Sequence, residues 1–491
     1  MNILMLYPKF PDTFWSFRHA LKFVRKKASS PPLGLLTVAA MLPPEWHVRL
    51  VDLNVNQLDQ QDLDWADYAF ISAMVVQRNS AAKVIEACVQ AGVNIVAGGP
   101  LFTSEHNAFP AVDHFILNEA EITLPQFLAD LEAGNPKRIY TTTEFPELHQ
   151  TPIPRWELVN FKHYATMDIQ FSRGCPYDCD FCNITTLFGR RPRLKTSAQL
   201  IAELDHLYAL GWRGSVFFVD DNFIGNKRQL KEDVLPALIL WREGKVGLPF
   251  STEVSINLVD DQDLMCMMVA AGFTTVFIGI ESPSEASLTE CNKFQNKNRD
   301  LVESVKSIQH AGLQVQGGFI IGFDNDSPAI FQQQIDFIQK SGIVSAMVGI
   351  LQAPPGTRLY SRLEAENRLL PSISGNNVDG STNIVPKMGF EALLAGYKHV
   401  LNQIYSPKLY YDRVITFLKE YQAPRIQVSL SSEHILAFFL SIYHLGIKGV
   451  ERFHYWRLWL WVLLHKPGLF PSAITLAIYG YHFRRICELN A

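Results

Sequence analysis

Two series of predicted strands, each alternating with segments of helical periodicity, constrain the fold of this chain more than any other feature. The first series has its apolar runs at residues 2–7, 48–53, 68–74, 94–100 and 114–121. Segments with helical periodicity, such as 32–42 and 80–90, lie between these runs. This alternation predicts an α/β fold in which residues 1–140 form a doubly wound, Rossmann-like parallel sheet domain.

A second series begins after a proline-containing segment, residues 141–166, which we interpret as a linker because it has little periodicity. Its predicted strands are at residues 168–174, 215–221, 250–256, 275–281, 313–323 and 345–352. Six strand–helix units predict a partial (β/α)6 TIM-type barrel over residues 167–370, with its chemistry at the carboxyl ends of the strands.

The alternation stops near residue 371, where a polar stretch is followed by helical patterns, so residues 371–491 are expected to form an α-helical domain. Two segments of it, 455–464 and 473–481, are strongly apolar and aromatic. Neither reaches the roughly 20 residues of a transmembrane helix. Buried core is the preferred interpretation of both, and a membrane-surface element is the alternative.

Charge and cysteine content narrow the class of protein. A formal net charge of -4 gives no electrostatic attraction to nucleic acid. The first residues lack the basic and apolar regions of a secretory signal, so we expect a cytoplasmic chain with reduced thiols. Seven cysteines are too few for a disulfide framework in a chain of 491 residues, and a tight group of them indicates metal binding or catalysis.

That group is Cys175, Cys179 and Cys182, with the spacing Cys-x3-Cys-x2-Cys directly after a predicted strand. Three thiolates suit a 4Fe-4S cluster and leave its fourth iron open to bind another molecule. A zinc site would need a fourth ligand from elsewhere in the chain, since no Cys or His follows within a few residues. That zinc site and three free thiols are the alternatives.

Together with the aromatic Phe181, these cysteines resemble the signature of the radical S-adenosylmethionine (radical SAM) enzyme family. The resemblance implies that S-adenosylmethionine binds the open iron. It also implies further contacts at later strand ends: Asp220, Asp221 and Asn222 for the methionine amino group, Glu281 for the ribose, and Gly317 and Gly318 near the adenine. For Glu281 the alternative is an ion pair at the barrel rim.

The first domain resembles that of the cobalamin-binding subgroup of the family, through PPLGLLTVAAMLP (31–43), VDLN (51–54), ISAM (71–74), GGPLFT (98–103) and NEAE (118–121). An open parallel sheet binds its ligand beyond the carboxyl ends of its strands. The resemblance therefore implies cobalamin there, with Ser72, Gly98, Gly99 and Glu119 as candidate contacts. The alternative is a flavodoxin-like domain with another ligand or none. The chain has no Asp-x-His-x-x-Gly motif, so water or no ligand is expected on the lower face of cobalt.

The long C-terminal region resembles that of hopanoid methylases and bacteriochlorophyll side-chain methylases, and so do FWSFRHALKF (14–23) and ECNKFQNKNRDL (290–301). This resemblance implies methylation of an unactivated carbon of a small hydrophobic substrate. It also implies a reducing partner such as flavodoxin or ferredoxin. Peripheral membrane contact through the C-terminal domain is compatible with it. Oxidation or ring formation, and a non-catalytic cobalamin- or redox-sensing protein, are the alternatives. Methylthio transfer to RNA is disfavoured because no basic domain is appended.

Cys291 lies within the second of these motifs. We prefer an unreactive thiol there over a second catalytic group, because reactivity requires a lowered pKa.

Overall fold

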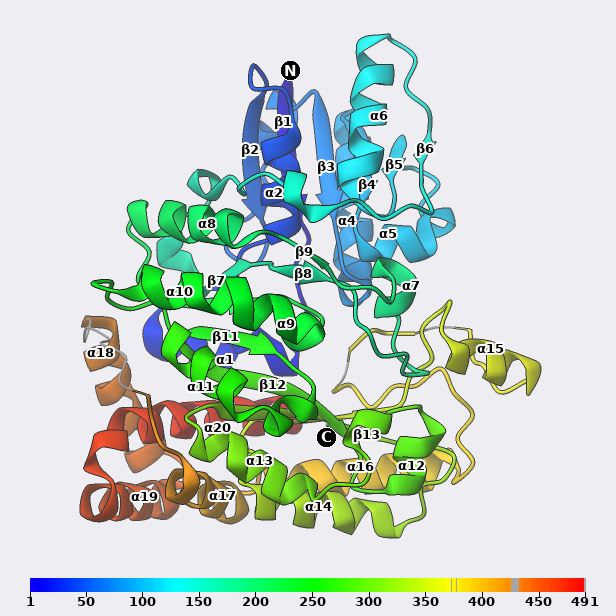
Figure 1. Cartoon of the computed structure of the whole chain (residues 1–491). Coiled ribbons are helices and arrows are strands. Elements are labelled where there is room, and N and C mark those ends of the chain that lie inside the picture. The colour runs from blue at the N-terminus through cyan, green and yellow to red at the C-terminus, as the bar shows by residue number, and fades with distance from the viewer. Residues whose placement is uncertain (372, 377, 425–431, 490–491) are drawn as a thin grey trace.

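The computed structural model describes residues 1–371, 373–376, 378–424 and 432–489. Residues 372 and 377 of the polar stretch predicted to begin the third domain lie outside this description. Two six-stranded sheets and a group of C-terminal helices make up the fold, coloured blue to cyan, green, and orange to red in Figure 1.

The N-terminal sheet has the strand order β2-β1-β3-β4-β5-β6, and every neighbouring pair is parallel. Its strands are β1 (Asn2–Tyr7), β2 (His47–Asp52), β3 (Tyr68–Ser72), β4 (Asn94–Gly98), β5 (His114–Ile116) and β6 (Ile139–Tyr140). Successive side chains point to opposite faces of a strand. In β1, Ile3 and Met5 accordingly join one apolar core, while Leu4 and Leu6 join another.

Helices cover both of these faces. One core takes side chains from α2 (Leu33–Met41) and α6 (Ala120–Glu132). The other takes them from α3 (Gln60–Trp65), α4 (Arg78–Ala91) and α5 (Pro100–Glu105). The prediction of a doubly wound parallel sheet is confirmed, and the short strand β6 is added to it.

The second sheet has the order β14-β13-β12-β11-β10-β7, again with parallel neighbours throughout. Its strands are β7 (Thr166–Ile169), β10 (Ser215–Phe218), β11 (Phe250–Glu253), β12 (Phe273–Glu281), β13 (Gln314–Ile321) and β14 (Ala346–Ile350). The connecting helices include α8 (Ser197–Ala209), α10 (Leu235–Arg242), α11 (Gln262–Ala271), α13 (Leu301–His310) and α14 (Ala329–Ser341). The strands lie in the sheet in the same order as in the sequence, as expected for a partial barrel. In the described part of the chain, β7 and β14 do not pair.

A segment from the start of the chain lies between these two edge strands. It contains η1 (Phe14–Ser16), α1 (Arg18–Leu21) and η2 (Lys22–Val24). On one side, the Thr166 amide of β7 donates a hydrogen bond to the Ser29 carbonyl at 2.8 Å. On the other, Trp15 Nε1 donates to Met347 Sδ of β14 at 3.0 Å. Residues 14–29 therefore bridge the open side of the barrel.

The C-terminal helices share one hydrophobic core with the barrel. They are α16 (Phe390–Ile404), α17 (Pro407–Glu420), α18 (Ser432–Ser441), η12 (Ile442–Ile447), α19 (Arg452–His465) and α20 (Phe470–Leu489). The ring of Phe483 in α20 stacks on Phe14 at 4.2 Å between centroids, so the last helix packs on the bridging segment. Among the helices of the described ranges, none has the length and apolarity to span a membrane.

Candidate active site

The three cysteines lie on a loop at the carboxyl end of the first barrel strand. After β7 the chain forms β8 (Ser172–Arg173), which pairs antiparallel with β9 (Arg193–Leu194), and the cysteines lie between these strands, before α7 (Ile184–Phe188). The loop begins at Gly174, whose φ of +93° favours glycine. A Cβ atom there would lie 2.9 Å from the carbonyl oxygen of Gly189, so the loop is closely packed at its base.

The thiols of these cysteines face a shared, largely buried space. Burial raises the pKa of Cys182 to about 12, and the nearby Cys179 and Cys175 raise it further, while Lys293 opposes this. Burial likewise raises the pKa of Cys175 and of Cys179. Three cysteine thiols on one loop are the donor set of an iron–sulfur cluster. Within the described ranges, no three His, Cys, Asp or Glu side chains are spaced to hold a single metal ion.

Asp220 anchors the start of this loop. Its Oδ1 accepts a hydrogen bond from Ser172 Oγ at 2.5 Å and another from the Ser172 amide, and its Oδ2 accepts one from the Phe171 amide at 3.2 Å. Burial raises the pKa of Asp220 to about 7, although these hydrogen bonds lower it. Asp220, which was predicted to contact the methionine amino group, therefore accepts its hydrogen bonds from the two residues that precede the cysteine loop.

The next two residues occupy different positions at the same edge of the barrel. Asp221 Oδ2 accepts from the Gly174 amide at 2.9 Å, and burial raises the pKa of Asp221 to about 6. Asn222 Oδ1 accepts from the Ser255 amide at 3.2 Å, beyond the end of β11. Of the three predicted residues, Asp221 is the one that hydrogen-bonds to Gly174, where the cysteine loop begins.

Glu281 forms an ion pair with Lys293, with 2.9 Å between Oε1 and Nζ. Its backbone has a φ of +63° where the pairing of β12 with β13 shifts register. Burial lowers the pKa of Lys293, but the Glu281 carboxylate and the Cys179 thiol together hold it above its ordinary range. The ion pair considered as the alternative for Glu281 is present, and its cation faces the cysteine thiols.

Glu253 is a half-buried acid at the carboxyl end of β11 that the sequence analysis did not single out. Burial raises its pKa to about 8, and the neighbouring Asp221 and Asp220 raise it further. The carboxyl group is therefore largely protonated near pH 7 and can donate a hydrogen bond. The signal that could have indicated it was an acid inside the predicted strand 250–256.

The two glycines of β13 point to opposite faces of the sheet. A Cβ at Gly318 would lie 2.8 Å from Cζ of Phe277, whose ring contacts Trp15 in the bridging segment. A Cβ at Gly317 would meet Phe319 and Ile343 on the other face. The structure therefore brings Gly318 to the inner face of the barrel, and Gly317 to the outer one.

Three of the four predicted cobalamin contacts lie together at the carboxyl edge of the N-terminal sheet. Ser72 and Gly98 are paired at the ends of β3 and β4. Gly99 follows with a φ of +89°, and a Cβ atom there would lie 2.6 Å from Ser72 Oγ. A Cβ at Gly98 would lie 2.7 Å from the carbonyl oxygen of Ile116. Only glycine backbone fits between these strand ends.

The fourth, Glu119, belongs to a buried ion-pair network. Its Oε2 lies 2.6 Å from Arg173 Nη1, and its Oε1 lies 2.7 Å from Arg193 Nη2. Glu121 Oε1 lies 2.7 Å from Arg173 Nη2. Because Arg173 and Arg193 are in the strands on either side of the cysteines, the network joins the N-terminal sheet to the cysteine loop.

A second polar cluster between the N-terminal sheet and the barrel was also missed. Tyr164 donates its hydroxyl hydrogen bond to Asp52 Oδ2 at 3.0 Å. Burial raises the pKa of Asp168, on β7, to about 7. Asp168 Oδ1 is buried and has no hydrogen-bond partner among the described residues. The signal that could have indicated this cluster was the charged Asp168 at the start of the predicted strand 168–174.

Comparisons with known proteins decide the family. Residues 169–338 match the family described as "Radical SAM superfamily", and residues 357–491 match a "Domain of unknown function (DUF4070)". A hopanoid C-2 methylase of Rhodopseudomonas palustris is 32% identical, over 98% of this chain and 92% of that protein. The chain belongs to the radical SAM superfamily.

This radical SAM enzyme has another relative along its whole length. An uncharacterized methyltransferase of Synechocystis is 41% identical, over 100% of this chain and 92% of that protein. The fold of the present chain is similar to that of a solved structure of the cobalamin-dependent S-adenosylmethionine radical enzyme OxsB, with aqua-cobalamin and S-adenosylmethionine bound. That similarity has a TM-score of 0.64 at 16% identity and covers 99% of this chain and 83% of the other.

In the radical SAM region, Cys291 lies beside the cysteine loop. Its carbonyl accepts a hydrogen bond from the Asp180 amide at 3.1 Å. Its thiol packs in an apolar cluster with Phe323 and Leu359, and burial raises the pKa of that thiol well above its ordinary range. These surroundings favour the unreactive thiol over a second catalytic group.

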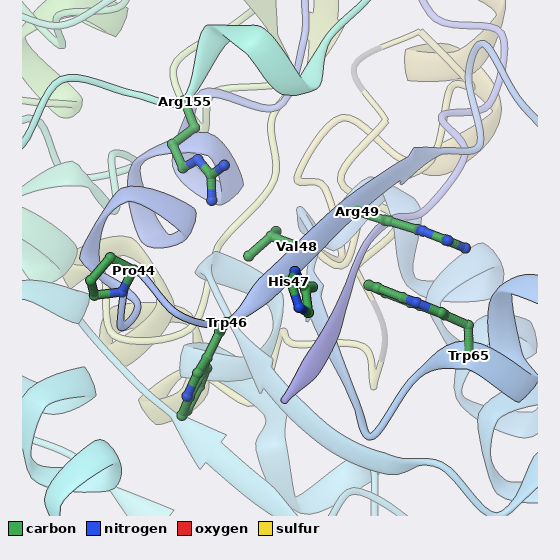
Figure 2. Close-up of a pocket in the computed structure, with 7 residues that line it drawn as sticks. All are labelled: Pro44, Trp46, His47, Val48, Arg49, Trp65 and Arg155. Atoms are coloured by element: carbon green, nitrogen blue, oxygen red, sulfur yellow. The ribbon is translucent and has the colours of Figure 1, made fainter.

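A separate hollow opens on the outer edge of the N-terminal sheet (Figure 2). It is lined by Pro44, Trp46, His47, Val48, Arg49, Trp65 and Arg155. His47 begins β2 and pairs with Asn2 at the start of β1, so the hollow reaches the amino ends of the strands. Doubly wound sheets bind ligands at the opposite, carboxyl edge. We therefore place the active site at the cysteine loop.

Proposed function

We propose that this enzyme is a cobalamin-dependent radical SAM methyltransferase that methylates an unactivated carbon of a hydrophobic, hopanoid- or tetrapyrrole-like substrate. The observation that carries the proposal is the network from Glu119 to Arg173 and Arg193, which holds the carboxyl edge of the N-terminal sheet against the cysteine loop. A corrin on that edge and a cluster on that loop would face the same space. The cobalamin bound by the OxsB structure supports this arrangement.

The donor chemistry of the loop fits a 4Fe-4S cluster. When bound, the cluster supplies the electron that cleaves S-adenosylmethionine, and methylcobalamin supplies the methyl group. Cys175, Cys179 and Cys182 would bind the cluster as thiolates. The buried ammonium of Lys293 would offset their negative charge, and Glu281 holds that ammonium in place.

For S-adenosylmethionine we propose Asp221, Asn222 and Glu253 as the polar groups at the strand ends and Gly318 as the glycine beside the adenine. A carboxylate there can accept from the ammonium of the methionine moiety. Asp220 would act by positioning the cysteine loop, because both of its oxygens accept hydrogen bonds from residues 171 and 172.

For cobalamin we propose that Ser72, Gly98 and Gly99 form the surface that contacts the corrin. An added Cβ atom at either glycine would collide with a neighbouring strand end, so this edge keeps its shape only with glycine at both positions. Glu119 would position this surface rather than touch the corrin, because its carboxylate is already paired with two arginines.

Substrate and reductant follow from the relatives and from the surface. The hopanoid C-2 methylase similarity extends over nearly the whole chain, which supports a polycyclic apolar substrate. The side chains of Arg190 and Arg358 are 63% and 53% exposed and flank Asp178 of the cysteine loop. Exposed cations at this place suit an acidic electron carrier such as flavodoxin or ferredoxin.

The test is anaerobic reconstitution of the full chain with iron, sulfide and hydroxocobalamin, followed by measurement of bound corrin and of deoxyadenosine formed from S-adenosylmethionine. We expect both in the parent chain. In Cys175→Ala we expect corrin but no deoxyadenosine. The matched control is Cys266→Ala, which removes an exposed cysteine outside the loop and should leave both signals unchanged.

Deoxyadenosine without bound corrin would overturn the cobalamin assignment, and absence of both would overturn the proposal as a whole. With a hopanoid or tetrapyrrole substrate, a product heavier by one methylene unit supports methyl transfer. A product that has instead lost two hydrogens would replace it with oxidation.

A further inference from the structure

The outer face of α19 carries a stripe of exposed apolar side chains. Phe453 and Leu464 are 75% and 74% exposed and Leu460 is 66% exposed. With Trp456 and Leu463 they recur at the three- and four-residue spacing of one helix face. The opposite face of α19 is buried in the core through Tyr455, Leu458 and Val462.

A second stripe lies on the preceding helical segment. It consists of Ile435, Phe439, Tyr443, Ile447 and Val450, all exposed, at spacings of four and then three residues along α18, η12 and the turn after it. We call the two stripes together the apolar helical face. Single exposed apolar residues are common on proteins, but a contiguous set on adjacent helices marks an interaction surface.

The two segments are packed against each other. The ring of Phe438 stacks on Trp459 at 5.4 Å between centroids. Trp456 Nε1 donates a hydrogen bond to the Gly446 carbonyl at 2.9 Å, which places the exposed Trp456 beside the exposed Ile447. The two stripes therefore meet at this end of the helical pair.

The unpaired charges beside this face are positive, whereas the acids at its margins, Glu433 and Asp412, are paired with Lys26 and Arg457. Lys448 Nζ lies 4.5 Å from the centre of the Tyr443 ring, and the Arg452 guanidinium lies 5.3 Å from that of Phe453. The one acid in residues 434–466 is Glu451, which is buried and paired with Arg484 at 2.8 Å. The chain as a whole has a net charge of -4, so this positive region stands out against it.

We propose that the apolar helical face is a membrane-binding surface that rests on an anionic lipid bilayer. Leucine and aromatic side chains would enter the boundary between headgroups and acyl chains, while Lys448 and Arg452 would reach the lipid phosphates. The 14 residues of α19 measure about 21 Å at 1.5 Å per residue, which suits a helix lying along the surface.

A bilayer fits this face better than a second copy of the chain does. A two-fold dimer would place the face against itself. Lys448 and Arg452 would then oppose cations of the other copy, with no exposed acid in residues 434–466 to pair with them. Anionic lipid supplies the missing charge. This proposal goes beyond methyl transfer, because binding to lipid requires neither cofactor nor substrate.

The test is flotation of the full chain with vesicles of phosphatidylcholine alone or of phosphatidylcholine mixed with phosphatidylglycerol. We expect binding to the anionic vesicles that weakens as salt is added. Replacing Phe453, Leu460 and Leu464 by serine should reduce the partition coefficient by about tenfold or more, because apolar area no longer enters the lipid. The control replaces Val89, Leu210 and Leu240, which are exposed outside the face, and should bind as the parent does.

Charge reversal of Lys448 and Arg452 to glutamate should abolish the preference for anionic vesicles while leaving the circular dichroism spectrum unchanged. Equal binding by the Phe453, Leu460 and Leu464 variant and the parent would overturn the proposal. So would a stable dimer in solution that this variant dissociates, since the face would then be a protein interface. Neither result affects the test of the proposed function, because corrin binding and deoxyadenosine formation are measured without lipid.

Discussion

Arg193 Nη2 lies 2.7 Å from Glu119 Oε1, and this buried ion pair connects the strand after the cysteines to the helix start of the N-terminal sheet. Arg193 also donates hydrogen bonds to the carbonyls of Pro146 and Phe188. One guanidinium thus holds together the N-terminal sheet, the segment that follows it and the end of α7. The relative placement of the two proposed cofactors depends on this contact.

Replacing Arg193 by methionine should destabilise the protein by about 3 kcal/mol, because it leaves a buried carboxylate without one of its partners. Urea unfolding of the cofactor-free chain measures this. The control is Arg228→Met, which breaks an exposed pair whose side chains are 84% and 63% exposed, and should cost less than about 0.5 kcal/mol. Similar losses of unfolding free energy in both variants would show that the buried network contributes no more to stability than an exposed ion pair does.

Lys293→Met should shift the reduction potential of the cluster to a more negative value, because a buried cation near the thiolates stabilises the additional electron. An electron paramagnetic resonance titration of the reconstituted protein measures the potential. Lys297→Met, four residues further along the same stretch and next to the exposed Phe294 ring, is the control and should leave the potential unchanged. An unchanged potential in Lys293→Met would mean that Lys293 serves only to pair Glu281.

Gly99→Ala should weaken corrin binding by about tenfold or more while leaving iron content unchanged, because the new Cβ would lie 2.6 Å from Ser72 Oγ at the edge of the sheet. Gly134→Ala is the matched control, since Gly134 also has a positive φ, of +73°, but no atom within 4 Å of an added Cβ. Equal corrin affinity in both variants would place the corrin elsewhere.

Asp168 should make the cofactor-free protein less stable as the pH rises. Its pKa is raised by burial from 3.8 to about 7 in the folded state, so the unfolded chain loses this proton first. The stability present below about pH 4 is lost progressively up to about pH 7, by about 4 kcal/mol at most.

Asp168→Asn should remove this part of the pH dependence. Thermal unfolding at pH 5 and pH 8 should show a stabilisation that is larger at pH 8. Asp220 and Glu253 have pKa values raised by burial in the same direction, so the variant keeps some dependence. A variant whose melting temperature changes equally at both pH values would argue against a raised pKa of the buried Asp168 carboxyl.

The sequence predicted the features that depend on neighbours along the chain. The three cysteines lie within eight residues of the sequence, and each strand–helix unit is formed by neighbouring residues. Spacing was therefore sufficient to predict the cysteine site, and periodicity was sufficient to predict the two sheets. Glu119 was assigned to cobalamin through the family resemblance of NEAE (118–121), whereas its partners Arg173 and Arg193 lie 54 and 74 residues later. Pairing across such distances depends on how the two sheets dock, which no local pattern encodes.

The same limit applies to Lys293 and to the bridging segment. Lys293 lay inside a motif that carried the family resemblance, but its position among the thiols follows from the path of the loop after β12. The contact of Trp15 with Met347 spans 332 residues. Because α20 also packs on that segment, three regions that could be distinguished by pattern share one core.

The bridging segment has a consequence for how the protein is made. Residues 14–29 are synthesised long before β14 and α20, against which they lie. Until β14 has been made, the edge of the unfinished barrel sheet exposes unpaired backbone groups that can pair with another nascent chain. The open side of the barrel can be bridged only once β14 has been synthesised, and we expect the nascent chain to depend on chaperones until then.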